Sequence, residues 1–270
     1  MTRRIILIAA FFSTLQYSFA QTGSDKNVLS LSIGPSFPVG NFSSVSPSNQ
    51  FAGYAKVGET ANISFVHKLN KNTGLMAMLY GQRNGLNTKE LEQQLSGAEI
   101  FPYNGSGFNH YPNWEIDKKS WYLESLLVGI TEEFFLKRDS KFSITARALA
   151  GVAYLQMPKL NGSSKTDTSY AIITQNSAAA FGFSYLAGAG VKYTLNKRLY
   201  LLFGADYFGT ATINFKNITE KIAGTSGGLI IPNYYSLSNS SNVSFGSSGT
   251  GNNKQPVGTI NVNFGIGVRM

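Results

Sequence analysis

The sequence of 270 residues contains no cysteine and only two histidines. Without cysteine the fold cannot use disulfides, on which small secreted domains often depend. Beyond residue 20 there is also no run of 18 apolar residues, although a membrane-spanning helix needs about 20. The sequence therefore excludes a disulfide scaffold and argues against a helical membrane protein.

Acidic residues are scarce as well, with 14 Asp and Glu against 23 Lys and Arg, for a formal net charge of +9. The first twenty residues hold two of the basic residues and no acidic one, so the rest carries (23 − 2) − 14 = +7. These charges are scattered, many of them in short turns, whereas nucleic-acid-binding proteins gather them in a patch. We expect no nucleic-acid partner, and we expect the turn charges to be solvated or to touch anionic lipid headgroups.

The start of the chain has the three parts of a secretory signal peptide. Arg3 and Arg4 supply the positive charge, residues 5–12 are apolar, and Ser18-Phe19-Ala20 places small residues at −3 and −1 of a cleavage site. A membrane anchor is the alternative, but the apolar run is too short to span a bilayer. We expect residues 1–20 to be a signal peptide that is removed.

The C-terminal segment alternates strictly over eleven positions. Its apolar set is Ile260, Val262, Phe264, Ile266, Val268 and Met270, and its polar or small set is Asn261, Asn263, Gly265, Gly267 and Arg269. A period of two places the two sets on opposite faces of a β-strand. The same pattern recurs in residues 29–34, 142–154, 181–195 and 199–207.

Three further segments, 54–67, 74–84 and 121–135, also predict strands but have a less clear phase. In the first, the alternation predicts a bulge near Gly58. In the third, both faces carry a glutamate, so the phase of that strand stays open.

The connections between these strands fall into two classes. Short ones are expected at 68–72, 136–140 and 196–198, and long ones at 43–53, 85–118, 156–178 and 212–257. Outer-membrane barrels have short periplasmic turns and long extracellular loops. We therefore expect residues 21–270 to form an all-β domain, an eight-stranded antiparallel up-and-down transmembrane β-barrel with long extracellular loops. Its last strand must pair with its first, because lipid offers no partner to an open edge.

Alternation alone does not say which face points outward, since a soluble barrel buries its apolar face inside. Three features favour an apolar outside. The opposite face is rich in Gly, Ser, Thr and Asn, which suit a narrow lumen. Aromatic residues gather near the strand ends, as in interfacial girdles, although β-propensity also enriches them in strands. The strands are also longer than the five or six residues that are usual in soluble proteins.

Several segments resemble the outer-membrane β-barrel families common in Bacteroidetes, which are OmpA-like in architecture and include PorT-like proteins. The segments are 34–42 (GPSFPVGNF), 122–124 (YLE), 188–193 (GAGVKY) with Asn196, and Gln21 after the cleavage site. The resemblance covers most of the mature chain and implies a fold and the bacterial outer membrane, but no activity. Such barrels often end in an aromatic residue, whereas this chain ends in Met270.

The sequence shows no catalytic, cofactor or metal motif. His67 is expected at a strand end and His110 in a long loop, and no spacing unites a serine, a histidine and an acid. The strongest polar feature is in the expected lumen. Arg147 and Asp206 lie about seven and eight residues beyond their short turns, which places them at similar heights. We expect them to pair, together with Glu124, because unpaired charges in a narrow interior are costly. This lumen cluster is interpreted as structural, with a gate or proton path as the alternative.

Two features of the long loops stand out. A capping box at 87–90 and Gly97 predict a short helix over 88–96, and residues 230–235 form an apolar and aromatic patch. The leading hypothesis is a structural or interaction barrel without catalytic activity, which contacts outer-membrane lipid and a protein partner through its loops. A narrow pore or ligand-transport barrel and a lipid-modifying enzyme are the alternatives. No cofactor is expected, and a monomer is the default.

Overall fold

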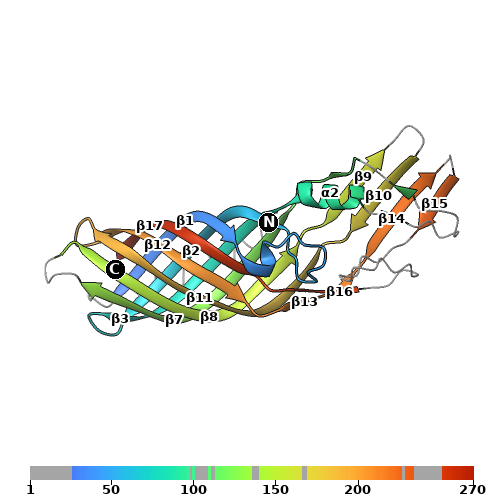
Figure 1. The fold of residues 1–270 in the computed structure, drawn as a ribbon. Helices are drawn as coiled ribbons and strands as arrows, with labels where there is room; N and C mark the ends of the chain where they lie inside the picture. Colours follow the sequence, from blue (N-terminus) through green and yellow to red (C-terminus); the bar gives the residue numbers. More distant parts are fainter. Residues whose placement is uncertain are drawn as a thin grey trace.

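The fold was analysed in a computed structural model that describes residues 26–97, 99–100, 109–110, 113–135, 140–165, 169–226, 229–233 and 251–270. The expected signal peptide and its cleavage site lie outside these residues. The molecule is elongated, with a barrel at one end and a second group of strands continuing beyond its rim (Figure 1). Among the described residues, no helix has the length and apolar character needed to cross a bilayer.

Eight long antiparallel strands close into the barrel, which confirms the predicted fold class. They are β1 (Asn27–Pro38), β2 (Ala55–Lys68), β3 (Thr73–Leu86), β7 (Ser120–Phe135), β8 (Phe142–Met157), β11 (Ala178–Thr194), β12 (Leu199–Thr210) and β17 (Gly258–Arg269). Their order around the barrel is β1-β17-β12-β11-β8-β7-β3-β2. The first and last strands pair as predicted, with Ile33 opposite Phe264. The predicted irregularity also occurs, as a register shift between Ala55 and Gly58.

The apolar face of the barrel points outward. Phe264 and Phe183 are 60% and 55% exposed, whereas Asn263 between two outward residues is 3% exposed. Aromatic pairs lie toward the two ends of this belt, such as Phe142 with Tyr193 on the short-turn side. Water would make so much exposed apolar surface unfavourable, whereas acyl chains match it. The chain is therefore a transmembrane barrel of the outer-membrane type.

The short connections lie at the end of the barrel where the described chain begins and ends. Met270 N donates to Asn27 O there at 2.8 Å. Two of the turns close in the same way: the side chain of Asn70 accepts bonds from the next turn residues, and Asn196 does so in its own turn. An asparagine side chain that accepts hydrogen bonds within its own turn explains why four residues suffice in each connection. This end is periplasmic by the usual arrangement of such barrels.

The described parts of the long connections at the other end form further strands, an α-helix and a 3₁₀ helix. A five-stranded sheet has the order β15-β14-β10-β9-β6. Its strands are β6 (Glu115–Ile116), β9 (Leu160–Lys165), β10 (Ser169–Gln175), β14 (Glu220–Ser226) and β15 (Leu229–Asn233). The smaller elements are η1 (Gly40–Phe42), α2 (Thr88–Gly97), the pair β4 (Glu99–Ile100) and β5 (Asn109–His110), and the pair β13 (Ile213–Ile218) and β16 (Gly251–Gln255). The helix confirms the prediction for residues 88–96, whereas the sheet was not predicted.

Candidate functional site

The structure brings Arg147 and Asp206 together inside the barrel. Arg147 Nε donates to Asp206 Oδ1 at 2.7 Å, and its Nη2 donates to the other carboxylate oxygen. The side chains are 16% and 1% exposed. Asn263 Nδ2 also donates to Asp206. The bidentate contact crosses β11 at Gly188, where a Cβ atom would lie 1.8 Å from Asp206 Oδ1, so glycine is required between the two charges.

Glu124 does not join this pair, and the expectation that it lies in the lumen is wrong. On β7, Trp121, Leu123, Ser125 and Leu127 are buried, whereas Glu124 is exposed on the outer face. The sequence does not reveal which residues of β7 face the lumen, because β7 carries large apolar residues on both faces. The third member of the lumen cluster is Asn263, which belongs to the polar face that the C-terminal alternation identifies.

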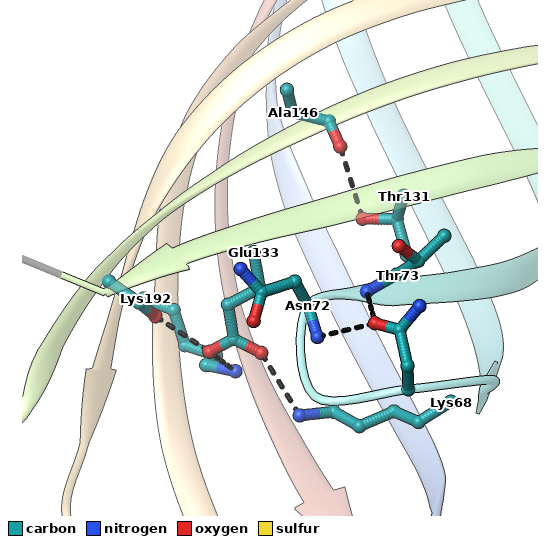
Figure 2. A network of polar contacts seen from close by, with 9 residues as sticks. Lys68, Asn72, Thr73, Thr131, Glu133, Ala146 and Lys192 are labelled. Carbon is teal, nitrogen blue, oxygen red and sulfur yellow. Dashed lines mark hydrogen bonds and ion pairs between the residues drawn. The ribbon is translucent and has the colours of Figure 1, made fainter. Parts of the chain in front are cut away.

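A second charged network, which sequence reasoning missed, lies at the periplasmic end of the lumen (Figure 2). The carboxylate of Glu133 on β7 lies between two ammonium groups. Lys68 Nζ at the end of β2 is 3.1 Å from Glu133 Oε2, and Lys192 Nζ on β11 contacts Oε1. Ser143 Oγ also donates to Oε1 at 2.7 Å. The neighbouring Glu132 lies on the opposite face, so the sequence could have found Glu133 only once the phase of β7 was known.

The two networks share one small cavity at the periplasmic mouth, with a volume of about 70 Å³. Lys68, Glu133, Arg147 and Lys192 line it, together with Tyr200. Lys192 also lies over the ring of Tyr200, 5.3 Å from its centroid. Each of these charges faces an opposite charge, which lowers the cost of taking it out of water. These ion pairs connect side chains of β2, β7 and β11 in one network and of β8 and β12 in the other.

Above these networks the lumen is filled by apolar side chains together with hydrogen-bonded polar ones, and the sequence reasoning did not predict the apolar part. The ring of Tyr80 on β3 stacks on that of Phe208 on β12, with centroids 4.6 Å apart and planes at 6°. These strands stand four places apart in either direction around the eight-stranded barrel, so the stacked rings bridge opposite walls. Met78, Leu127 and Leu186 complete this layer and are at most 1% exposed. This layer separates the charged periplasmic mouth from the extracellular end of the lumen.

A further plug of buried residues caps the barrel at its extracellular rim. The ring of Phe42 packs edge-on against Trp121 at 5.6 Å, and Phe215 lies 6.4 Å from the same indole. Trp121 Nε1 donates to Gly53 O at 2.9 Å, which fixes the first long loop over the lumen. Phe42 and Phe215 are 1% and 0% exposed. These loop side chains are therefore packed together and cover the extracellular opening of the barrel.

The extracellular sheet has its own core, on the face that α2 covers. Trp114, Ile116, Leu160, Ala171 and Ile173 are buried there, and Leu91 and Leu95 of α2 pack against them. The helix is tied down by polar contacts as well: Glu92 accepts from Ile116 N at 2.9 Å, and Tyr54 Oη donates to Gln94 at 2.7 Å. Burial at this contact raises the pKa of Tyr54 above its ordinary value.

The opposite face of the sheet is open and mixes aromatic, aliphatic and polar side chains. Tyr170 and Ile172 on β10 are 37% and 41% exposed, and they pair with Lys165 and Ser163 of β9. Glu115 of β6 lies opposite Ser163 on the other side. Exposed aromatic and aliphatic side chains such as these are enriched in protein contact surfaces, whose rims are polar.

The remaining sequence candidates give no reactive site. His67 is exposed and its Nδ1 lies 2.8 Å from Asn27 Oδ1, while the side chain of His110 lies outside what the structure describes. Within the described ranges, no three His, Asp or Glu residues are grouped so that they could hold a metal ion. Residues 230–233 of the apolar patch form part of β15, and Tyr234 and Tyr235 lie outside the described residues.

No protein-family model matches the sequence, and neither does any curated protein. Solved structures do resemble the fold. Ail, the attachment invasion locus protein of Yersinia pestis, is 16% identical, with 91% of this chain and 99% of that chain covered and a TM-score of 0.37. The outer membrane protein OprG from Pseudomonas aeruginosa is 8% identical, with coverage of 90% and 96% and a TM-score of 0.39. A major outer membrane protein from Thermus thermophilus is 11% identical, with coverage of 90% and 99% and a TM-score of 0.44. The likeness is one of fold alone.

Proposed function

We propose that this protein is an outer-membrane anchor that presents a folded extracellular sheet to a partner, and that it has no catalytic activity. The observation that carries the proposal is the contrast between a filled lumen and an ordered surface outside the membrane. The stacked rings of Tyr80 and Phe208 block the barrel axis. The sheet beyond the rim has a core of its own and an open face with Tyr170 and Ile172.

This contrast argues against the alternative of a pore. Conduction requires open space along the barrel axis, whereas fully buried side chains, among them Met78, Leu127 and Leu186, fill the lumen above the charged mouth. The charged groups below these side chains are already paired with one another. A lipid-modifying enzyme is the other alternative. The segments 34–42 and 188–193 support the proposal that the chain is related to the OmpA-like and PorT-like barrels of Bacteroidetes.

The hairpin β9–β10 offers a direct test, because Met157 and Ala178 at its base are paired neighbours in the barrel wall. Replacing residues 158–177 with the two-residue turn Asn-Gly should close β8 onto β11 as an ordinary hairpin. We expect the shortened protein to fold, as shown by the change of gel mobility on heating, but to lose adhesion of expressing cells to other cells or coated surfaces. Equal adhesion of both forms would contradict the proposal.

Planar-bilayer recordings supply the second arm of the test. We expect no conductance steps from either form, because the packed side chains that fill the lumen lie below the deleted hairpin. Steady channel currents from the intact protein would favour the pore over the anchor as its function.

A further inference from the structure

The cavity at the periplasmic mouth of the barrel holds more positive than negative charge. Three cations line it, Lys68, Lys192 and Arg147, but only one carboxylate does, that of Glu133. The second carboxylate, Asp206, is bonded to Arg147. Each of these side chains has a partner of opposite charge, yet the two networks together contain three positive groups and two negative ones. One positive charge is therefore left over in the group as a whole.

This surplus lies largely out of water. The side chains of Glu133 and Lys192 are 8% and 7% exposed, and that of Lys68 is 22% exposed. Arg269 at the end of β17 is a further positive charge that repels Lys192. Charges that are removed from water need to be balanced, and a cleft with charge of one sign and low-dielectric walls concentrates ions of the other sign. The mouth should therefore attract an anion.

Two hydrogen-bond donors of the cavity lining have no partner among the residues that the structure describes. Arg147 uses Nε and Nη2 for Asp206, which leaves Nη1. The hydroxyl group of Thr145 likewise has no described partner. Thr145 pairs with Glu133 in the register, and its level on β8 lies midway between that of Lys192 and that of Arg147. N–H and O–H donors beside surplus positive charge suit an anion as ligand.

The size of the cavity limits which anion it can take. Its volume of about 70 Å³ exceeds the roughly 10–15 Å³ that one water-sized particle needs. A halide ion is close to a water molecule in size, so it fits together with some of its hydration water. An organic anion such as gluconate is several times larger. The cavity therefore selects small anions.

We propose that this cavity binds one small monovalent anion, such as chloride. The anion accepts hydrogen bonds from Arg147 Nη1 and Thr145 Oγ1 and is held by the positive potential of Lys192. Its negative charge brings the two networks to three positive and three negative groups. The anion thereby couples the two ion-pair networks and stabilises the folded barrel. The site is independent of the extracellular sheet and of the function proposed for that sheet.

Bromide is a direct probe of this site, because it can replace chloride and scatters X-rays anomalously. Crystals of the intact, unmodified protein grown in sodium bromide should show an anomalous peak in the cavity, beside Arg147 and Thr145. Bromide-containing crystals without a peak at this place would overturn the proposal.

Urea titration of the protein in lipid vesicles, followed by gel mobility, is the test in solution. Sodium chloride is exchanged for sodium gluconate at constant ionic strength, so that general screening stays the same. Because the anion binds only the folded state, a tenfold increase in chloride above its dissociation constant should raise the folding equilibrium constant up to about tenfold. An equilibrium constant that is the same in both salts would contradict the site.

Three variants relate this chloride dependence to the number of charges. Lys192→Met leaves two cations and two carboxylates and should abolish the dependence. Glu133→Gln leaves three cations and one carboxylate and should increase it. Lys141→Met, at an exposed position at the same end of the barrel, is the matched control and should not change it. The heat-dependent gel mobility shows which variants fold. A dependence that survives Lys192→Met, or that Lys141→Met abolishes, would show a diffuse effect of surface charge and overturn the proposal.

Discussion

The barrel and the extracellular sheet both alternate between buried and exposed positions along their strands, but they bury different kinds of side chain. In the barrel the large apolar residues, such as Phe264, point outward and the lumen receives Asn263. In the sheet the apolar residues Ala171 and Ile173 point inward beneath α2. The difference is the medium outside, which is acyl chains around the barrel and water around the sheet. Alternation therefore identifies two faces, and the surrounding solvent decides which one is buried.

The lumen itself contains a second contrast, between a charged mouth and an uncharged middle. The mouth is stabilised by ion pairs, and the middle by ring stacking, aliphatic packing and hydrogen bonds between neutral side chains. Breaking one partner of a buried pair leaves an uncompensated charge, which is costlier than removing an exposed group. The largest effect is therefore expected at the mouth.

Arg147→Ala should lower the free energy of unfolding by about 3–5 kcal/mol, because Asp206 is left in the lumen without its cation. Urea titration of the protein in lipid vesicles, followed by gel mobility, measures the change. Lys165→Ala on the exposed strand β9 is the matched control and should have little effect. An unchanged midpoint for Arg147→Ala would show that the pair does not stabilise the barrel.

Phe264→Arg sharpens the comparison between the two media. A cation on the lipid face near the bilayer midplane should cost about 2–4 kcal/mol. The same change at Ile172, which is exposed on the extracellular sheet, should stay within about 0.5 kcal/mol. The same urea titration applies to both variants. Similar costs at the two positions would contradict the assignment of different solvents to the two regions.

Within the sheet, Ile173→Val should cost about 0.5–1.5 kcal/mol, because it removes a buried methylene beneath α2. Ile172→Val on the open face is the control and should be close to neutral. Protease cleavage of the loops on intact cells reports the local stability. Faster cleavage of the Ile172 variant than of the Ile173 variant would contradict the assignment of Ile173 to the buried face and Ile172 to the open face.

The barrel strands could be predicted from the sequence because a long segment that alternates apolar with polar or small residues fits only a β-strand with two different faces. Their closure followed from the lack of hydrogen-bond partners in lipid. The Arg147–Asp206 contact also followed from position, since both lie on the small-residue face at similar distances from their turns.

Other parts could not be predicted, for identifiable reasons. Glu124 was misplaced because Leu126 and Leu127 make both faces of β7 apolar, so no hydrophobic signal fixes the phase. The Tyr80–Phe208 layer was missed because β3 likewise carries Leu79 beside Met78 and Tyr80. The extracellular sheet was missed because β9 reads Leu-Asn-Gly-Ser-Ser-Lys, which has no alternation, and its fold depends on packing against distant Trp114 and α2.

Fluorescence quenching by brominated lipids tests the outward orientation of the apolar face most directly. The two native tryptophans, Trp114 and Trp121, are 3% and 5% exposed, so they should contribute little quenching. Phe264→Trp should be strongly quenched by lipids that carry bromine on the acyl chains, and Phe208→Trp should not. Strong quenching at position 208 and none at position 264 would contradict the account, because it would place the polar face against the membrane.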